Sequence, residues 1–224
     1  MRDLNKVVNA IRQELPDYRL GKQAELEARI KPKLRTAISA IFRKHITDSY
    51  AQGISYVTSL PGFSGIQGFL TSSDLEIIKG LADSYSTRFW GRLNLSLGNT
   101  INSEHLNKPE AELLNPNYIV NALAIGATNE ALNQATLRKA QALTGGTNGP
   151  LHHVGIAQEF DEFDFPNLPL DLELVAVWVT SLDELVCPIC EDLEGDYPLA
   201  DGDPPLPVED SHPNCRCRII IEGA

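Results

Sequence analysis

All four cysteines of this 224-residue chain lie near its C-terminus, in two short clusters. Cys187 and Cys190 form a Cys-Pro-Ile-Cys turn, and Cys215 and Cys217 follow His212 in the sequence His-Pro-Asn-Cys-Arg-Cys. A tetrahedral metal site takes four soft or borderline ligands, usually from two short clusters on separate turns. The spacing therefore predicts a structural metal site, and zinc is the expected ion.

Five candidate ligands compete for the four positions of that site. The first choice is the four thiolates of Cys187, Cys190, Cys215 and Cys217, with His212 outside the coordination sphere. The alternative set is Cys187, Cys190, His212 and Cys215. Alternate side chains of an extended strand point to the same face, so Cys215 and Cys217 are expected to reach the same centre.

Four other roles of the cysteines are alternatives to a structural zinc site. A redox turn of the glutaredoxin-like kind is disfavoured, because too little chain follows Cys190 to complete such a fold. A zinc deaminase pairs His-x-Glu with Pro-Cys-x-x-Cys, and this sequence contains no His-x-Glu. Disulfides from Cys187 to Cys215 or Cys217 stay open as the alternative, since a finished particle can be oxidising. The clustering also disfavours plain buried cysteines.

The net charge of −11 is spread unevenly along the chain. Residues 1–50 carry a net charge of +5, whereas residues 151–224 carry −15. A basic N-terminal part suits an acidic protein surface or nucleic acid, and the acidic C-terminal part argues against DNA binding there. No apolar run approaches the roughly 20 residues of a membrane span, so no membrane partner is expected. The charged N-terminus lacks the apolar core of a signal peptide, which favours a cytoplasmic protein.

Hydrophobic periodicity predicts long helices followed by short strands. Helices are expected over 4–15, 24–57, 73–98 and 117–143. Pro32 implies a kink or a break in the second of these, and Ser73 with Glu76 predicts a capping box for the third. Strands are expected over 172–181 and 215–222, on either side of a proline-rich loop.

These elements predict an α+β protein with a mostly helical N-terminal part. The small C-terminal domain would contain a short antiparallel sheet and a cysteine-rich staple. Three regions are expected: a basic helical, partner-binding region over 1–70, a long-helix region over 71–148, and an acidic Cys/His domain over 149–224. Two strands and a proline-rich loop make a poor core by themselves, and such small units need a staple.

The order of residues in the C-terminal part resembles the phage head morphogenesis family, the Mu F-like minor head proteins. That pattern runs Trp, Thr/Ser, Asp, Cys-x-x-Cys, Leu-x-Gly, and then His-Pro-x-Cys-Arg-Cys with an apolar strand. The matching positions are Trp178, Thr180, Ser181, Asp183, Cys187, Cys190, Leu193, Gly195, His212, Pro213, Asn214, Cys215, Arg216 and Cys217. The preceding helix, over 120–145, is also similar to the family's helix of small residues.

The resemblance implies a structural virion protein and not an enzyme, with no catalytic residues and no cofactor other than the metal. It would associate with the portal protein and capsid interior proteins in several copies around the portal. There it would aid head assembly or genome packaging and delivery, after assembly in the host cytoplasm. Packaged DNA is a further candidate partner.

Two alternatives from other classes stay open. One is a metal-dependent hydrolase or nuclease that uses the Cys/His site. The other is a zinc-stapled interaction module of prophage origin. The sequence contains no Gly-x-Ser-x-Gly, phosphate loop or His-Glu-x-x-His motif, each of which would have favoured a particular enzyme class.

Overall fold

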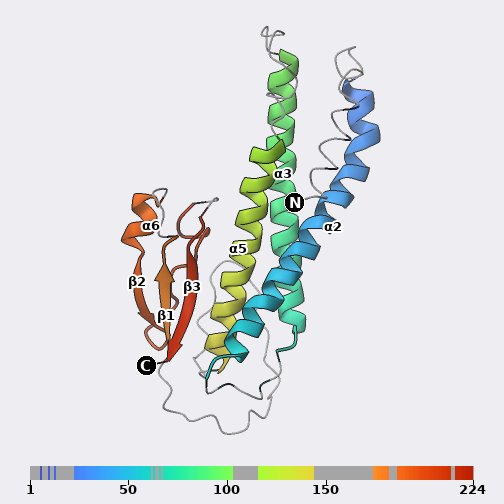
Figure 1. The fold of residues 1–224 in the computed structure, drawn as a ribbon. Coiled ribbons are helices and arrows are strands. Elements are labelled where there is room, and N and C mark those ends of the chain that lie inside the picture. Colours follow the sequence, from blue (N-terminus) through green and yellow to red (C-terminus); the bar gives the residue numbers. More distant parts are fainter. Residues whose placement is uncertain are drawn as a thin grey trace. The chain divides into compact units, whose positions relative to one another are not determined.

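The fold of the chain is α+β, as predicted from the sequence (Figure 1). The computed structural model describes residues 6, 10, 13, 23–61, 63, 66, 68–102, 116–143, 174–181, 186–212 and 215–223. Three long helices come first, namely α2 (Gln23–Thr58), α3 (Ser72–Asn102) and α5 (Pro116–Leu143). The later elements are β1 (Leu174–Val179), α6 (Pro188–Asp192), β2 (Gly195–Pro198) and β3 (Arg218–Gly223).

Two predictions fall on parts of the chain that are not described. The predicted helix over 4–15 lies outside the described residues except for Lys6, Ala10 and Gln13, which are helical. The predicted boundary between 148 and 149 also lies outside them. In the part of the chain that the structure describes, no helix is long and apolar enough to cross a membrane.

Helix α2 follows the predicted apolar pattern but runs through its proline without a break. Ile38, Phe42, Ile46 and Tyr50 are spaced four residues apart and are all buried, as one face of a helix requires. Pro32 lies inside the helix, so of the predicted kink or break the break is wrong, whereas the kink stays a prediction. A proline removes one backbone N–H donor, and the remaining bonds of a 36-residue helix hold the segment helical.

Helix α3 begins at Ser72, and its capping residue, Thr71, lies two residues before the predicted one, Ser73. The hydroxyl of Thr71 accepts a hydrogen bond from the Asp74 backbone N–H (3.2 Å), and the Asp74 carboxylate accepts one from the Thr71 N–H (2.8 Å). These reciprocal bonds form the capping box, with the acidic partner three residues after the cap. Ser73 lies inside the helix, so the position predicted from Ser73 and Glu76 is corrected to Thr71 and Asp74.

The chain divides into two compact units, each built from two stretches of sequence. Unit 1 comprises Met1–Asp48 and Thr71–Thr128, and unit 2 comprises Ser49–Leu70 and Asn129–Ala224. Helices α2 and α5 each contribute one end to unit 1 and the other end to unit 2.

Unit 1 has a helical core with an aromatic centre. The ring of Phe42 on α2 lies 5.9 Å from that of Tyr85 and 6.2 Å from that of Phe89, both on α3. All three side chains are buried. Tilted and edge-on ring pairs at such distances add to the stabilisation that burial alone provides.

Unit 2 contains a three-stranded antiparallel sheet in the order β2-β1-β3. The central strand β1 alternates buried and half-buried residues, which is the pattern of a sheet with one face on a core. Trp178 near its end is fully buried and is paired with Gly195 of β2 and Ile219 of β3. The strand predicted over 172–181 is thus confirmed. The strand predicted over 215–222 begins later, at Arg218, and β2 was not predicted.

The proline-rich loop between β2 and β3 belongs to the core of unit 2. Leu199, Leu206 and Val208 are buried against the sheet and the cysteines. Asp210 holds the loop in shape, because its carboxylate accepts from the Leu206 N–H at 2.7 Å and its own N–H donates to the Leu206 carbonyl at 2.9 Å. The loop therefore supplies apolar material that its turn-rich sequence did not predict.

Candidate metal centre

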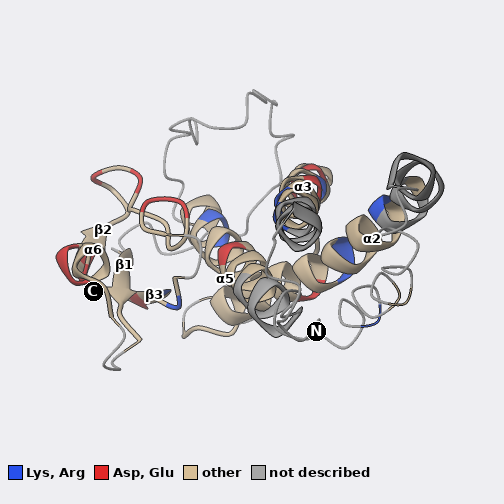
Figure 2. Cartoon of the chain, turned by 90° about the horizontal axis from the view of Figure 1, so that it is seen from above, with Lys and Arg blue, Asp and Glu red and all other residues tan. Residues whose placement is uncertain are grey.

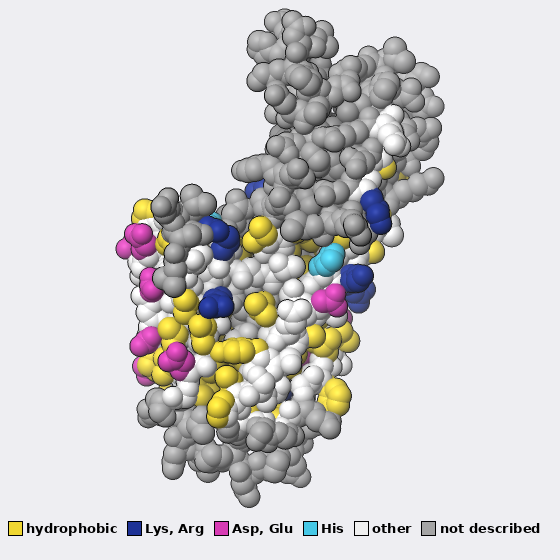
Figure 3. Space-filling view, in the orientation of Figure 1, with side chains coloured by type: hydrophobic (Ala, Val, Ile, Leu, Met, Phe, Trp, Pro, Cys, Tyr) yellow, Lys and Arg dark blue, Asp and Glu magenta, His cyan; other side chains and the backbone are white. Residues whose placement is uncertain are grey.

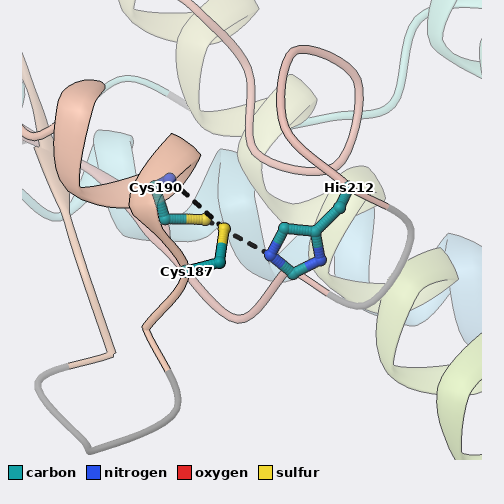
Figure 4. A group of neighbouring side chains, drawn as sticks. All are labelled: Cys187, Cys190 and His212. Atoms are coloured by element: carbon teal, nitrogen blue, oxygen red, sulfur yellow. Dashed lines mark hydrogen bonds between the residues drawn. The ribbon is translucent and has the colours of Figure 1, made fainter.

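The first cysteine cluster is arranged by the short helix α6. Cys187 is the N-cap of this helix, with Pro188 at its first position. A proline fits there because its fixed φ suits a first turn and its missing N–H needs no partner. The Cys187 sulfur accepts the backbone N–H of Cys190 at 3.4 Å. The turn thereby brings the sulfur of Cys187 toward the side chain of Cys190 (Figure 4).

The second cluster meets the first at Cys190. The Nε2 atom of His212 lies 3.3 Å from the Cys190 sulfur, as Figure 4 shows. The Cys215 sulfur lies 3.8 Å from the same Cys190 sulfur. A backbone hydrogen bond of 2.9 Å from the Cys215 N–H to the His212 carbonyl closes the turn between these two residues.

The five predicted ligands form two groups of three that share Cys190. Within the first group, Cys187, Cys190 and His212, the ligand atoms lie within 4.8 Å of one another. The same holds for the second group, Cys190, Cys215 and Cys217. Among the described residues no larger group of these atoms meets that distance, so neither predicted four-ligand set is assembled as one group. Cys190 is common to both.

The chemistry and spacing of these groups fit a thiophilic divalent ion. Thiolate and imidazole are the ligands that zinc takes in structural sites, and two sulfurs bound tetrahedrally at a Zn–S length of about 2.3 Å lie about 3.8 Å apart. The Cys190–Cys215 separation of 3.8 Å matches that edge. All four cysteines are free thiols in this structure, so none of the predicted disulfides is formed.

The three inner thiols have perturbed acidities. Burial raises the pKa of Cys190 well above its usual range, and hydrogen bonds with Cys187 and Cys217 add to the rise. Burial likewise raises the pKa of Cys217. For Cys215 burial acts in the same direction, but hydrogen bonds to its sulfur from the Ser211 hydroxyl and backbone N–H groups outweigh it, so its pKa is lowered. A cation would stabilise all three as thiolates.

A strained residue lies in the loop beside the centre. Val208 has a φ of +79°, a left-handed conformation that a β-branched residue rarely adopts and that costs about 1–3 kcal/mol. Its backbone N–H donates to the Ser211 hydroxyl at 3.2 Å and also contributes to the lowered pKa of Cys215. The strained residue is therefore also one whose backbone N–H helps to stabilise the Cys215 thiolate.

Sequence analysis missed two polar residues of α5 that contact the cysteine segment. Asn129 and Asn133 hydrogen-bond to backbone groups of residues 215–219. Asn133 is only 1% exposed. A signal for them is present in the sequence, since two asparagines four residues apart share a helix face with small residues such as Gly126 and Ala140, and buried amides require partners.

The acidic character of the C-terminal part extends over the surface around the centre. In Figure 2 the acidic residues colour α6 and the loops that flank the sheet, and in the face drawn in Figure 3 acidic side chains lie along the α6 and β2 edge. Arg216 and Arg218 are the two basic residues of the 151–224 region, and both are exposed. They alternate with the buried cysteines, as an extended segment requires.

No protein-family model, curated protein or solved structure matches this chain. The resemblance to the Mu F-like family therefore rests on the ordered motif from Trp178 to Cys217. Of that motif, Asp183, Pro213 and Asn214 lie outside the described residues.

Proposed function

We propose that this chain is a minor head protein of the Mu F-like head-morphogenesis kind, whose C-terminal unit is stapled by one zinc ion. The observation that carries the proposal is the convergence on Cys190 of every Cys and the His of the motif. The protein would act in the virion head as a structural component. It would contact the portal and capsid interior proteins there, and aid head assembly or genome packaging and delivery.

The position of the cysteines in the sheet supports a stapling role. Cys187 and Cys190 precede β2, and Cys215 and Cys217 precede β3. Both outer strands begin opposite the C-terminal end of β1, where Trp178 pairs with Gly195 and Val179 pairs with Arg218. One metal ion would therefore tie together the starts of the two edge strands. Strands of six, four and six residues are short enough to need such a link.

The charge distribution supports a protein partner. Helix α2 carries exposed basic side chains at Arg35, Arg43 and Lys44, which suit the acidic surface of a portal or capsid protein. Packaged DNA would be attracted by the same charges. The 1–50 region, however, also contains six acidic residues, and the intermixed charge favours a protein surface.

Two measurements test the proposal. Anaerobically purified protein is expected to contain one zinc per chain and to expose its thiols only after chelation. Co-expression with the portal protein of the same phage is expected to give a complex that survives gel filtration. Zinc without portal binding would favour the interaction module of prophage origin. If the protein contains neither metal nor free thiols, the staple consists of disulfides and not of zinc. If it contains no metal and has four reactive thiols, there is no staple.

A metal-dependent hydrolase or nuclease is the second candidate, because Cys187 and His212 are half-exposed. Solvent access on that side would suit a metal with an open position for water, as catalytic zinc requires. The zinc-loaded protein should then hydrolyse ester, peptide or nucleic acid substrates, and His212→Ala should abolish turnover. Zinc-loaded protein without turnover on any of these substrates would leave the structural role.

A further inference from the structure

The two edges of β3 have different partners. One edge pairs with β1, and because the sheet order is β2-β1-β3 no strand of the described residues lies beside the other edge. Helix side chains supply partners at this second edge. The Ile219 N–H donates to Asn133 Oδ1 at 2.9 Å, and the Ile221 N–H donates to the hydroxyl of Tyr56 on α2 at 3.3 Å. Covering an edge in this way prevents another chain from adding to it.

The same edge continues into the segment that carries two candidate metal ligands. The ladder with β1 ends at Arg218, so Cys215 and Cys217 lie beyond it. Their carbonyls are held by Asn129, whose side-chain amide donates to the Cys215 oxygen at 3.0 Å and to the Cys217 oxygen at 2.7 Å. An amide NH₂ group has two hydrogens, and both bonds can form at once.

Asn133, one helical turn further along α5, fixes the register of the segment. Its amide nitrogen lies 3.4 Å from the Cys217 carbonyl oxygen while its oxygen accepts from the Ile219 N–H. Reversing the amide would place donor against donor, so only one orientation satisfies both groups. A shift of the segment by one residue would break these bonds and turn both cysteines to the opposite face.

We propose that Asn129 and Asn133 are positioning residues of the metal centre, which set the affinity for zinc by holding the backbone of Cys215–Cys217. The inference rests on the proposed zinc site. Neither amide is a metal ligand in this proposal. Each acts through backbone atoms of the ligand segment, as residues that orient metal ligands commonly do. Loss of Asn129 would free the two carbonyls and let the two sulfurs spread apart.

The test compares Asn129→Ala with Tyr56→Phe in the full-length protein. Asn129 is half-buried and tolerates substitution better than Asn133. Tyr56→Phe removes a bond to the same edge of β3, but at Ile221, four residues beyond Cys217. Zinc affinity is measured by competition with a chromophoric chelator, and the geometry by the visible spectrum of the Co²⁺-substituted protein. Asn129→Ala is expected to weaken zinc binding by about 10- to 100-fold and to change the Co²⁺ spectrum, whereas Tyr56→Phe changes neither.

Each outcome decides between the two proposals. Absence of zinc binding by the wild-type protein overturns the zinc site itself, and this inference with it. Zinc binding that is equal in wild type and Asn129→Ala overturns the inference alone. Equal weakening by Asn129→Ala and Tyr56→Phe also overturns it, because the effect then comes from strand stability. If Asn129→Ala does not fold, Asn129→Gln replaces it: the retained donor on a longer side chain should still alter the Co²⁺ spectrum, and an unchanged spectrum counts against the proposal.

Discussion

Each unit is stabilised internally by a different kind of contact. In unit 1 the core is a row of buried apolar and aromatic side chains, and the side-chain hydrogen bonds among its described residues are mostly local, such as those from Thr47 and Ser86 to carbonyls four residues earlier. In unit 2 the hydrogen bond that Asn129 donates and the one that Tyr56 accepts join residues 86 and 165 positions apart, and three of the buried core residues are thiols. Unit 1 thus depends on burial, whereas unit 2 depends on specific groups being in place.

This difference predicts that the metal matters to unit 2 and not to unit 1. Replacing Cys190 by Ser removes the ligand common to both groups of three, and zinc binding is expected to be lost. A structural zinc can contribute on the order of 10 kcal/mol to folding. Amide hydrogen exchange followed by mass spectrometry should therefore show lost protection over 186–223 and retained protection over 36–48 and 72–92.

Chelation of the wild-type protein is the matched control for Cys190→Ser. It removes the metal without placing a hydroxyl in a buried position, and added zinc should restore protection. Unchanged exchange over 186–223 after chelation would show that the apolar core of unit 2 holds without metal. Equal loss of protection in both units would show that the two do not fold separately.

The converse experiment disrupts the core of unit 1. Phe42 is 2% exposed and contacts the rings of Tyr85 and Phe89 on α3, so Phe42→Ala should lower the free energy of unfolding of unit 1 by about 3–5 kcal/mol. Zinc content should stay at the wild-type value, because no predicted ligand lies in unit 1. Urea unfolding followed by exchange at 36–48, with metal analysis of the same sample, measures both.

Phe69→Ala, in unit 2, serves as the control for loss of a phenyl ring that lies outside any core. Phe69 is 71% exposed, and loss of an exposed side chain alters stability by less than about 0.5 kcal/mol. Loss of zinc in Phe42→Ala but not in Phe69→Ala would mean that the aromatic core supports the metal centre, and the contrast between the units would not hold.

The same difference explains which features could be predicted from the sequence. The apolar stripe of α2 and the β-branched run of β1 are local patterns with fixed periods, and both were located closely. The clustering of Cys187, Cys190 and their partners likewise predicted which residues meet. Local patterns could not predict α6 and β2, since four- and five-residue elements carry too little periodicity.

The details of the centre depend on contacts between distant residues, which periodicity does not encode. Nothing local indicates that Asn129 would meet the Cys215 carbonyl 86 positions away. The capping box of α3 was predicted at Ser73 and is found at Thr71. Both residues have a hydroxyl and an acidic residue three positions later, so the local pattern fits either position. The burial of Val208 in a left-handed conformation likewise follows from tertiary packing and could not be predicted.

The smallest expected effect concerns the part of unit 2 that does not depend on metal. A methyl group added at Gly53 of α2 would lie 2.5 Å from the Leu132 carbonyl oxygen and 2.8 Å from the Ala135 Cβ on α5. The two helices would have to separate, and Gly53→Ala should destabilise unit 2 by about 1–3 kcal/mol. Thermal unfolding of the zinc-loaded protein measures this loss.

Gly80→Ala on α3 is the matched substitution, because a Cβ there meets nothing within 4 Å. Alanine is the better helix former by about 1 kcal/mol, so this variant should be more stable than wild type. The same chemical change is therefore expected to have opposite signs in the two units. A stabilising Gly53→Ala would mean that α2 and α5 are not in close contact at Gly53, and the contrast between the two glycines would not hold.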